Sequence, residues 1–487
     1  MTGKGLVVGI IILFIFLALA PTINANTSKS TSSETKDTIT VDDEGDGDFT
    51  NIQDAVDASN TGDIIEIYSG TYFESVIVDK QLTLIGIPYE LGGGNDNGMP
   101  IVMKGEEEQI FTLTADNCIF SGFDLRDIDG FTLDGILVFS DNNKIYNNTV
   151  TSNFGIHLYE SSNNSVYDNY FPDGHTGISI VKSNDNKIYQ NTMRDNSQSI
   201  KLHYKSGNNL VYQNNIESSY GYGINQWESN NNTIYENEIR NCVMVGIKIE
   251  AEDAEGYGYE IYDNTISNCG KGIIISSWDN TVYDNEITNC EYGIFFKWMY
   301  WTFPPMAPHH NKVADNIIKN NNEGIYADGG AYNNITGNTI SENVLSGLYL
   351  KEVKYCNIVG NNITDNQKDG IDFDLSHHNL ISQNNIVNNS NEGIEIFDSF
   401  QNTISENNII NNYRGILLDY STENRILNNN LIDNTIDAFM ETCIFNLWLR
   451  NYWDGARAFP KIIFGIQYEF IPWINIDFLP AQEPYNI

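Results

Sequence analysis

Four carboxylates lie on two neighbouring copies of a short motif in the C-terminal half of the chain. In this motif, Gly-aliphatic-x-aliphatic, the residue between the aliphatics points away from them when the segment is a β-strand. Carboxylates held close together repel, which raises the pKa of one of them, and a protonated and an ionised carboxyl group together can hydrolyse a glycosidic bond. The alternative is an ordinary acidic surface on a chain of formal charge −39. The candidate catalytic residues are Asp369, Asp372, Glu392 and Glu395.

Aromatic residues are concentrated in the longest insertion between motifs. Trp298, Tyr300 and Trp301 lie within nine residues rich in aromatic side chains and proline. Flat aromatic faces suit the C–H surfaces of sugars, and functional loops often emerge from rigid scaffolds. We therefore predict that these three residues bind substrate, together with Asp374 and Arg414 beside the carboxylates. The alternative is a loop that folds back and buries its own rings.

A basic set occurs on earlier motifs. It consists of His157, Lys201, His203, Lys205 and Lys248. Elimination on acidic sugars needs a base and a nearby cation, which such residues could supply. The set is dispersed along the sequence, so we do not expect a lyase site there.

The elements that must position these residues are set by a repeat of about 23 residues, which runs from Gly135 to Met440. Each unit opens with the glycine motif and continues with Asn-x-(Ile/Val)-x-x-Asn-x-(Ile/Val). A fixed period with two-residue alternation inside it predicts stacked β-coils. We predict an all-β fold, a right-handed parallel β-helix with three short strands and roughly 22–23 residues per coil. The opening glycines are Gly155, Gly177, Gly223, Gly246, Gly272, Gly293, Gly324, Gly347, Gly370, Gly393 and Gly415, and Ser199 fills the one vacant slot.

Asparagine and cysteine occupy fixed lanes in the repeat. Two asparagine lanes lie five residues apart, with Tyr259 and Cys356 as exceptions in one of them. Asparagine tolerates left-handed backbone at bends, and its amide can bond the amide of the next coil. Cys242, Cys269 and Cys290 share another lane, where we expect a buried stack of thiols. The asparagines therefore indicate stacking rather than catalysis.

The chain divides into four predicted segments. Residues 1–25 contain an apolar run, short for a membrane span, and are predicted to be a secretory signal or an uncleaved N-terminal anchor. Residues 26–37 form a linker, residues 38–446 the β-helix, and residues 447–487 a C-terminal aromatic plug. A helical cap is predicted over residues 49–56, with Thr50 and Gln53 as a capping box. We expect an exported, extracellular or cell-surface monomer.

The formal charge of −39 limits the kinds of binding partner that the chain can have. A surface of this sign repels phosphate, so nucleic acid is excluded as a partner. Calcium takes oxygen ligands and could bind the acidic strip, although the chain has no EF-hand loop and no nonapeptide repeat. No cofactor is required by this interpretation, and the identity of any metal is left open.

Short motifs near both ends of the β-helix are Asp46-Gly47-Asp48-Phe49-Thr50, Gly62-Asp63, Ser69-Gly70-Thr71-Tyr72 and the ending Asn451-Tyr452-Trp453-Asp454. The N-terminal part is similar to the first coil of pectin-lyase-like proteins, and the asparagine-rich repeats resemble the NosD-like and CASH (carbohydrate-binding and sugar hydrolase) group. The resemblance covers nearly all of residues 38–455 and implies the fold. It does not imply one activity, because this superfamily contains esterases, lyases, hydrolases and non-enzymes.

Enzyme signatures of this superfamily are mostly missing. Asp369-Gly370-Ile371-Asp372 lines up with the first motif of polygalacturonase-type hydrolases, and Asn391-Glu392-Gly393-Ile394 stands one coil later. The third coil reads Tyr413-Arg414-Gly415, without the histidine of that family. Copper, which the NosD name suggests, needs soft or imidazole ligands, and the histidines here are scattered.

These observations leave three hypotheses. The leading one is recognition of a polysaccharide or glycan along one face, with its processing left open. The second is a non-catalytic structural envelope or adhesion protein, and the third is a polysaccharide hydrolase or lyase. Exposure of Trp298 and Trp301 separates the first two, since rings lining a groove favour binding and buried rings favour a structural role.

Overall fold

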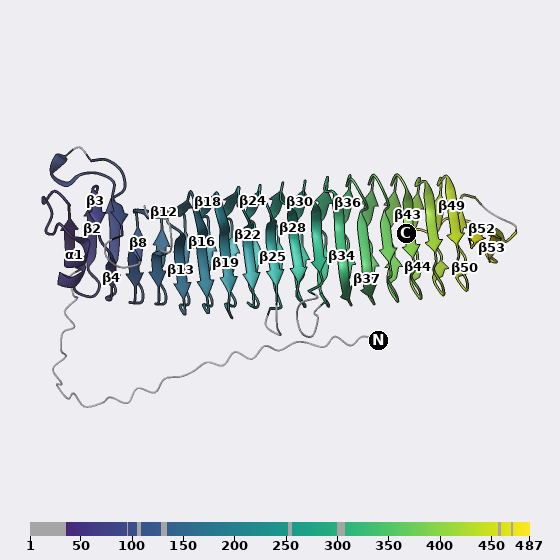
Figure 1. Cartoon of the computed structure of the whole chain (residues 1–487), viewed down its shortest axis with the longest axis horizontal. Helices are drawn as coiled ribbons and strands as arrows, with labels where there is room; N and C mark the ends of the chain where they lie inside the picture. Colours follow the sequence, from purple (N-terminus) through teal and green to yellow (C-terminus); the bar gives the residue numbers. More distant parts are fainter. Residues whose placement is uncertain are drawn as a thin grey trace, which may run out of the picture. The chain divides into compact units, whose positions relative to one another are not determined.

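The computed structural model describes residues 36–94, 96–104, 109–127, 134–251, 256–299, 307–455, 459–468 and 471–487. Asp37–Ile487 forms one compact unit. Within this unit, short strands stack as parallel coils along one axis, with a single α-helix among the described residues (Figure 1). The predicted all-β parallel β-helix is confirmed.

Each coil contributes one strand to each of three parallel sheets. In one coil these are β43 (Glu392–Phe397), β44 (Thr403–Ser405) and β45 (Asn408–Ile410), and β46 (Arg414–Asp419) begins the next. β43 pairs with β46 so that Ile394 lies beside Ile416 and Ile396 beside Leu418. All four of these side chains are fully buried. The aliphatic residues therefore form continuous inner columns, and the residues between them form outer columns, as alternation along a strand requires.

The glycine lane allows the coils to approach closely at one corner. A Cβ on Gly393 would lie 2.7 Å from the Gly415 carbonyl oxygen and 2.7 Å from Ile409 Cγ2. Both distances are far inside van der Waals contact, so this lane accepts little beyond glycine. Ser199, in the vacant slot, is fully buried and its hydroxyl lies 2.6 Å from the Ser219 hydroxyl.

The asparagine lanes are hydrogen-bonded ladders. Asn384 Oδ1 accepts bonds from the Asn361 backbone N–H and side-chain amide, both at 2.9 Å, while Asn384 Nδ2 donates to Ile358 O and Asn407 Oδ1, both at 2.9 Å. The predicted stacking is confirmed, but the left-handed backbone is not at these positions. Positive φ falls one residue earlier, as at Gln383 (φ 58°), so the ladder asparagine itself is free to span two coils.

Replacing Asn384 with alanine is expected to lower the free energy of unfolding by about 2 kcal/mol, because it leaves the buried donors of Asn361 and the backbone acceptor of Ile358 without hydrogen-bond partners. The measurement is a thermal melt of the purified protein. Asn357→Ala is the matched control, because Asn357 is exposed on a strand and makes one side-chain bond, to Asn334. Equal melting temperatures for the two variants would contradict a stabilising ladder.

The cysteine lane is confirmed and continues as asparagine. Cys242, Cys269 and Cys290 are buried free thiols on successive coils. The Cys290 backbone N–H donates to Asn321 Oδ1 at 2.9 Å, and Asn321 N–H donates in turn to Asn343 Oδ1. Thiols and amides thus fill the same inner corner, and the amides add hydrogen bonds along the axis.

The N-terminal end of the coils is covered by α1 (Ile52–Ala58), which buries Ile52, Ala55 and Val56. The predicted Thr50–Gln53 capping box does not form. Glu74 replaces it, since its two carboxylate oxygens accept bonds from the Ile52 and Gln53 backbone N–H groups at 2.8 and 2.9 Å. A carboxylate at a helix N-terminus also interacts favourably with the helix dipole.

At the C-terminal end, coil strands run beyond the expected boundary at residue 446. β50 (Leu447–Leu449) and β51 (Tyr452–Trp453) pair with the preceding coil, and Trp448 and Trp453 are buried inside it. The antiparallel pair β52 (Lys461–Gln467) and β53 (Ile471–Asp477) follows. Asp477, fully buried, accepts bonds from Arg450 N–H, Asn451 N–H and Trp453 Nε1, which ends the asparagine ladder. Other aromatic rings of the predicted plug are exposed, namely Phe459, Phe464, Trp473 and Phe478.

The predicted signal or anchor, residues 1–25, and most of the predicted linker lie outside the described residues. In the part of the chain that the structure describes, no helix has the length and apolarity needed to cross a bilayer.

Candidate functional site

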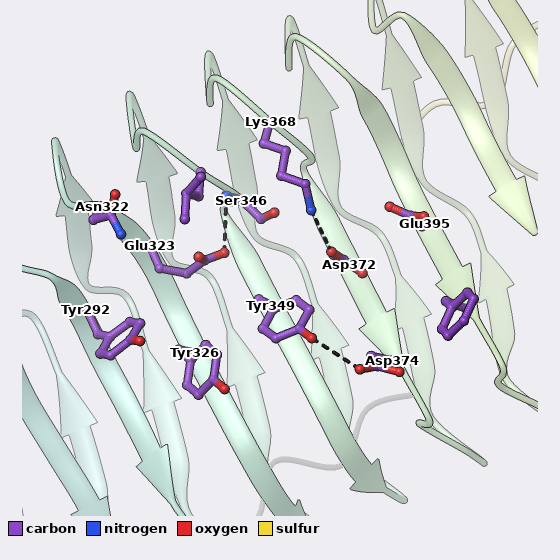
Figure 2. Close-up of a pocket in the computed structure, with 12 residues that line it drawn as sticks. Tyr292, Asn322, Glu323, Tyr326, Ser346, Tyr349, Lys368, Asp372, Asp374 and Glu395 are labelled. Atoms are coloured by element: carbon purple, nitrogen blue, oxygen red, sulfur yellow. Dashed lines mark hydrogen bonds and ion pairs between the residues drawn. The ribbon is translucent and has the colours of Figure 1, made fainter. Parts of the chain in front are cut away.

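The candidate site lies on the outer face of the sheet that contains the glycine-motif strands. Tyr326, Tyr349, Asp372 and Glu395 are register partners on four successive coils, so their side chains stand side by side (Figure 2). The sequence places them there because each is the residue between two inward aliphatics. The strands are β31 (Tyr292–Lys297), β34 (Glu323–Ala331), β37 (Leu348–Lys354), β40 (Ile371–Asp374) and β43.

These columns border a cleft of about 450 Å³. Tyr292, Tyr326 and Tyr349 form one side, with ring centroids 4.8 Å apart for the first pair and 5.3 Å for the second. The rings are tilted by 31° and 33° rather than stacked flat. Tilted rings keep part of each aromatic face open, which suits contact with a sugar ring. The remaining lining residues are Asn322, Glu323, Leu345, Ser346, Lys368, Asp372, Asp374, Glu395 and Phe397.

Lys368 lies at the centre of the acidic part of the cleft. Its Nζ is 2.9 Å from Asp369 Oδ2 and 3.1 Å from Asp372 Oδ2. Burial lowers the pKa of Lys368, but the hydrogen bonds and charges of Asp369 and Asp372 raise it more, so this lysine stays charged. A fixed cation between two carboxylates lets both approach one another.

Two further contacts orient the wall of the cleft (Figure 2). Tyr349 OH donates to Asp374 Oδ2 at 3.2 Å, and Ser346 N–H donates to Glu323 Oε1 at 3.1 Å. Each bond joins neighbouring coils. The polar groups are therefore held in place before any ligand arrives, which lowers the entropic cost of binding.

The carboxylates of the cleft have raised pKa values. Burial, with Coulomb repulsion from Asp369 and Asp374, raises the pKa of Asp372 to about 6. Burial and the charges of Asp372 and Asp369 raise that of Glu395 to about 7, and burial raises that of Glu323 to about 7. Oxygens of Asp369, Asp372 and Glu395 lie within 4.8 Å of one another. Near neutral pH the cleft therefore holds protonated and ionised carboxyl groups together, as acid and base catalysis requires.

Asp369, Glu392 and Arg414 lie below the cleft rather than in its lining. Asp369 is fully buried and accepts bonds from Glu392 N–H and Asn391 Nδ2, both at 3.0 Å. Glu392 is 2% exposed and accepts a bond from Arg414 Nη1 at 2.8 Å. These residues sit at the corner of the coil, before the alternating part of the strand, so their side chains turn under the neighbouring coil. Burial and Asp369 raise the pKa of Glu392 to about 8.

The aromatic insertion contributes to a different pocket. Trp298 is half-buried, and its ring lies so close to Gly329 (φ 86°) that a Cβ there would be 2.5 Å from Trp298 Cε3. Trp298 borders a pocket of about 400 Å³ together with Lys354 and His377. Tyr300 and Trp301 lie outside the described residues. The structure thus brings Asp372, Asp374 and Glu395 together in one cleft and places Trp298 elsewhere.

The cleft also contains residues that sequence reasoning missed. Tyr292, Tyr326, Tyr349 and Lys368 line it but were not among the predicted binding residues. A signal was present for two of them, since Tyr326 and Tyr349 occupy the outward position of their motifs two coils and one coil before Asp372, respectively. Lys368 lies in a bend, where alternation gives no direction.

A parallel β-helix with a preformed polar cleft on the outer face of one sheet defines the class of this protein. Matches to two protein families define its classification more narrowly. The chain belongs to the family described as "Periplasmic copper-binding protein (NosD)", which matches residues 202–299 and 306–469. The family described as "Right handed beta helix region" matches residues 101–239 and agrees with the predicted hand. No curated protein matches the chain.

Solved structures with similar folds include polysaccharide-processing enzymes. An alginate lyase from Paenibacillus sp. str. FPU-7 is 13% identical, with a TM-score of 0.37, and the match covers 65% of this chain and 98% of that one. A PL6 alginate lyase in complex with trisaccharide is 13% identical, with a TM-score of 0.45 and coverage of 71% and 86%. The catalytic domain of a GH87 α-1,3-glucanase in complex with nigerose is 14% identical, with a TM-score of 0.43 and coverage of 66% of both chains. At these values the likenesses say nothing about activity.

Among the described histidine, cysteine and carboxylate side chains, no group of three or more fits a copper centre. In the described part of the chain, the sets of three side chains close enough to share an ion are two carboxylate clusters. One consists of Asp42, Asp43 and Glu90, and the other of Asp369, Asp372 and Glu395. Carboxylate oxygen is a hard ligand that suits calcium or magnesium, whereas copper sites use imidazole, thiolate or thioether. The adjacent His309 and His310 lie with their Nδ1 atoms 2.8 Å apart, and no third histidine, cysteine or carboxylate is grouped with them among the described residues.

Proposed function

We propose that this chain is an exported protein that recognises a polysaccharide in the cleft between Tyr292 and Glu395. The strongest supporting observation is the outer column of register partners on four successive coils, Tyr326, Tyr349, Asp372 and Glu395. It presents aromatic surface and hydrogen-bonding groups together along the axis of a rigid scaffold. Aromatic rings can contact sugar C–H groups, while carboxylates and lysine can bond sugar hydroxyls. The periplasmic description of the family supports export.

The charge of the cleft favours a neutral sugar. Glu323, Asp372, Asp374 and Glu395 line it against the single cation Lys368. A carboxylate or sulfate on the ligand would meet these acids and be repelled at short range. Within this cleft we therefore expect neutral sugar units.

Hydrolysis is the second candidate function, and one observation favours it. Asp372 and Glu395 have pKa values of about 6 and 7, and their carboxyl oxygens lie within 4.8 Å of one another. One can donate a proton to the leaving oxygen while the other remains ionised. A binding site would not need this arrangement, although it would tolerate it.

A panel of neutral and acidic polysaccharides, with and without Ca²⁺, tests both candidates. Binding, new reducing ends and the absorbance of unsaturated uronate are followed in parallel. Binding without products would support recognition alone, and new reducing ends would support hydrolysis. Absence of both would refute the proposed function and favour a structural role at the cell surface.

Replacing Tyr349 with alanine is expected to weaken binding of the best neutral glycan at least about tenfold, because it removes ring surface and the bond that fixes Asp374. Calorimetric titration measures the effect. Tyr235→Ala is the matched control, since Tyr235 is an equally half-buried tyrosine stacked on Tyr212 and Tyr262 in another sheet. Similar losses in the two variants would place the glycan outside this cleft.

A further inference from the structure

Basic and neutral polar side chains, in contrast to the acidic ones of the cleft, lie on the same sheet on earlier coils. His157 pairs in register with Ser179, Ser179 with Lys201, and Lys201 with Asn225. His203 follows two residues after Lys201 and so shares its face, with Nε2 3.4 Å from the Ser179 hydroxyl. The basic residues expected to be dispersed are therefore neighbours on adjacent coils. The strands are β13 (Phe154–Tyr159), β16 (Gly174–Val181), β19 (Asn196–His203) and β22 (Tyr222–Trp227).

Lys201 is a half-buried lysine without a counterion. Its ammonium group makes no hydrogen bond or ion pair with the part of the chain that the structure describes. The nearby carboxylates are engaged elsewhere, Asp134 with His157 Nδ1 at 3.3 Å and Glu250 with Lys248. Burial lowers the pKa of Lys201, and the charge of Lys248 lowers it further. In a chain of net charge −39, a partly buried cation without a counterion is suited to bind an anionic ligand.

Buried hydrogen-bonding atoms beside Lys201 also lack partners. His203 is 9% exposed and its Nδ1 has no hydrogen bond, and the same is true of His157 Nε2. Burial and the charge of Lys201 lower the pKa of His203 to about 3, so its ring is neutral and carries one N–H. Buried polar atoms are normally hydrogen-bonded, so unsatisfied ones in a cluster indicate a missing ligand.

Space for a ligand is present next to this column. A groove of about 630 Å³ runs beside it and is lined by Tyr159, Val181, Lys182, Tyr204, Lys205 and Glu228. These residues follow the column residues on the same strands and bends, and Tyr204 is 42% exposed. The groove offers aromatic surface beside the cation, which a ligand with an apolar ring face and one negative charge would use.

We propose that His157, Ser179, Lys201 and His203 form a second subsite, which binds the carboxylate of an acidic sugar. One lysine without a counterion, beside hydroxyl and imidazole groups, matches a single negative charge. Seven strand pairings separate β19 from β40, so at about 4.8 Å each the subsite lies roughly 34 Å from Asp372 on the same sheet. The identity of the ligand as a sugar rests on the proposed function, whereas the anion site itself does not.

Titration of the protein with oligogalacturonate at low salt tests the subsite. Lys201→Met is expected to weaken binding at least about tenfold, and Lys201→Arg to retain most of it. Lys187→Met, at an exposed lysine of another sheet, should leave binding unchanged. Acetate and inorganic phosphate are separate arms, and tighter binding of either than of the oligomer would overturn the assignment to a sugar.

Wild-type protein gives a second readout that does not depend on a variant. A bound carboxylate beside Lys201 should shift the His203 ring signals in NMR and raise the pKa of that ring. Absence of both oligogalacturonate binding and the His203 shift overturns the proposal, as does equal affinity in wild type and Lys201→Met. Loss of uronate binding with neutral-glycan binding intact distinguishes this subsite from the cleft, where Tyr349→Ala should have the opposite pattern.

Discussion

Asparagine in place of Asp372, or glutamine in place of Glu395, is expected to lower glycosidic hydrolysis at least about a thousandfold if the cleft is catalytic. Each change keeps the shape of the side chain but removes its ability to exchange a proton. Asp372 and Glu395 are neighbours in register, and their pKa values of about 6 and 7 allow one to be protonated while the other is ionised near neutral pH. The release of reducing ends from the best substrate in the panel measures the effect.

The control for these variants is Glu342→Gln, which removes an exposed carboxylate from another face. It should keep full activity, and all three variants should melt near the wild-type temperature. Turnover that survives both Asp372→Asn and Glu395→Gln would exclude hydrolysis by this pair. Glycan binding that survives with it would leave recognition as the function.

Much of this fold could be predicted because its constraints are local and recur in every coil. The glycine lane marks the corner where backbones approach, as at Gly393, and the two asparagine lanes mark the ladders. Alternation then assigns an inner or outer side to each strand residue. Asp372 and Glu395 could therefore be placed on one outer face without coordinates.

The alternation rule fails at the corners of the coil. Asp369 precedes β40 and Glu392 is the first residue of β43, and both are buried against the next coil, where Asn391 and Arg414 donate hydrogen bonds to them. Lys368 lies in a bend, and its contact with two carboxylates depends on the path of that bend. The Thr50–Gln53 cap failed for a similar reason, since Glu74, 22 residues after Ile52, accepts hydrogen bonds from the backbone N–H groups at the start of the helix instead.

The basic subsite shows a different limit. His157 and Lys201 are 44 residues apart in the numbering, and in the sequence they look dispersed. Their proximity depends on register over two strand pairings, which the repeat predicts only if each coil has the same length. The absence of a counterion at Lys201 depends on where Asp134 and Glu250 point, and no sequence pattern contains that information.

Acidification of the protein from pH 8.5 to 6.5 is expected to stabilise it by about 3 kcal/mol, counted from the proton uptake of the buried carboxyl groups. Burial raises the pKa values of Glu323 and Glu395 to about 7 and, with Asp369, that of Glu392 to about 8. In the unfolded chain glutamate titrates near 4.5, so in this window the folded protein binds more protons. The stabilisation is complete below the unfolded pKa and is lost as pH rises through the folded values.

The pH window separates this effect from competing ones. His203, whose pKa burial lowers to about 3, acts in the opposite direction, but only below the ordinary histidine value of 6.5. Ordinary surface carboxylates are ionised throughout the window, so their mutual repulsion stays constant. Thermal melts at pH 6.5 and 8.5 should differ by several degrees in wild type and by less in the double variant Glu323→Gln, Glu395→Gln, while Glu342→Gln keeps the full difference. If the melting temperature of the double variant changes between pH 6.5 and 8.5 as much as that of wild type, these carboxyl groups are ionised in the folded protein at pH 6.5. The cleft would then lack the protonated carboxyl group that hydrolysis needs.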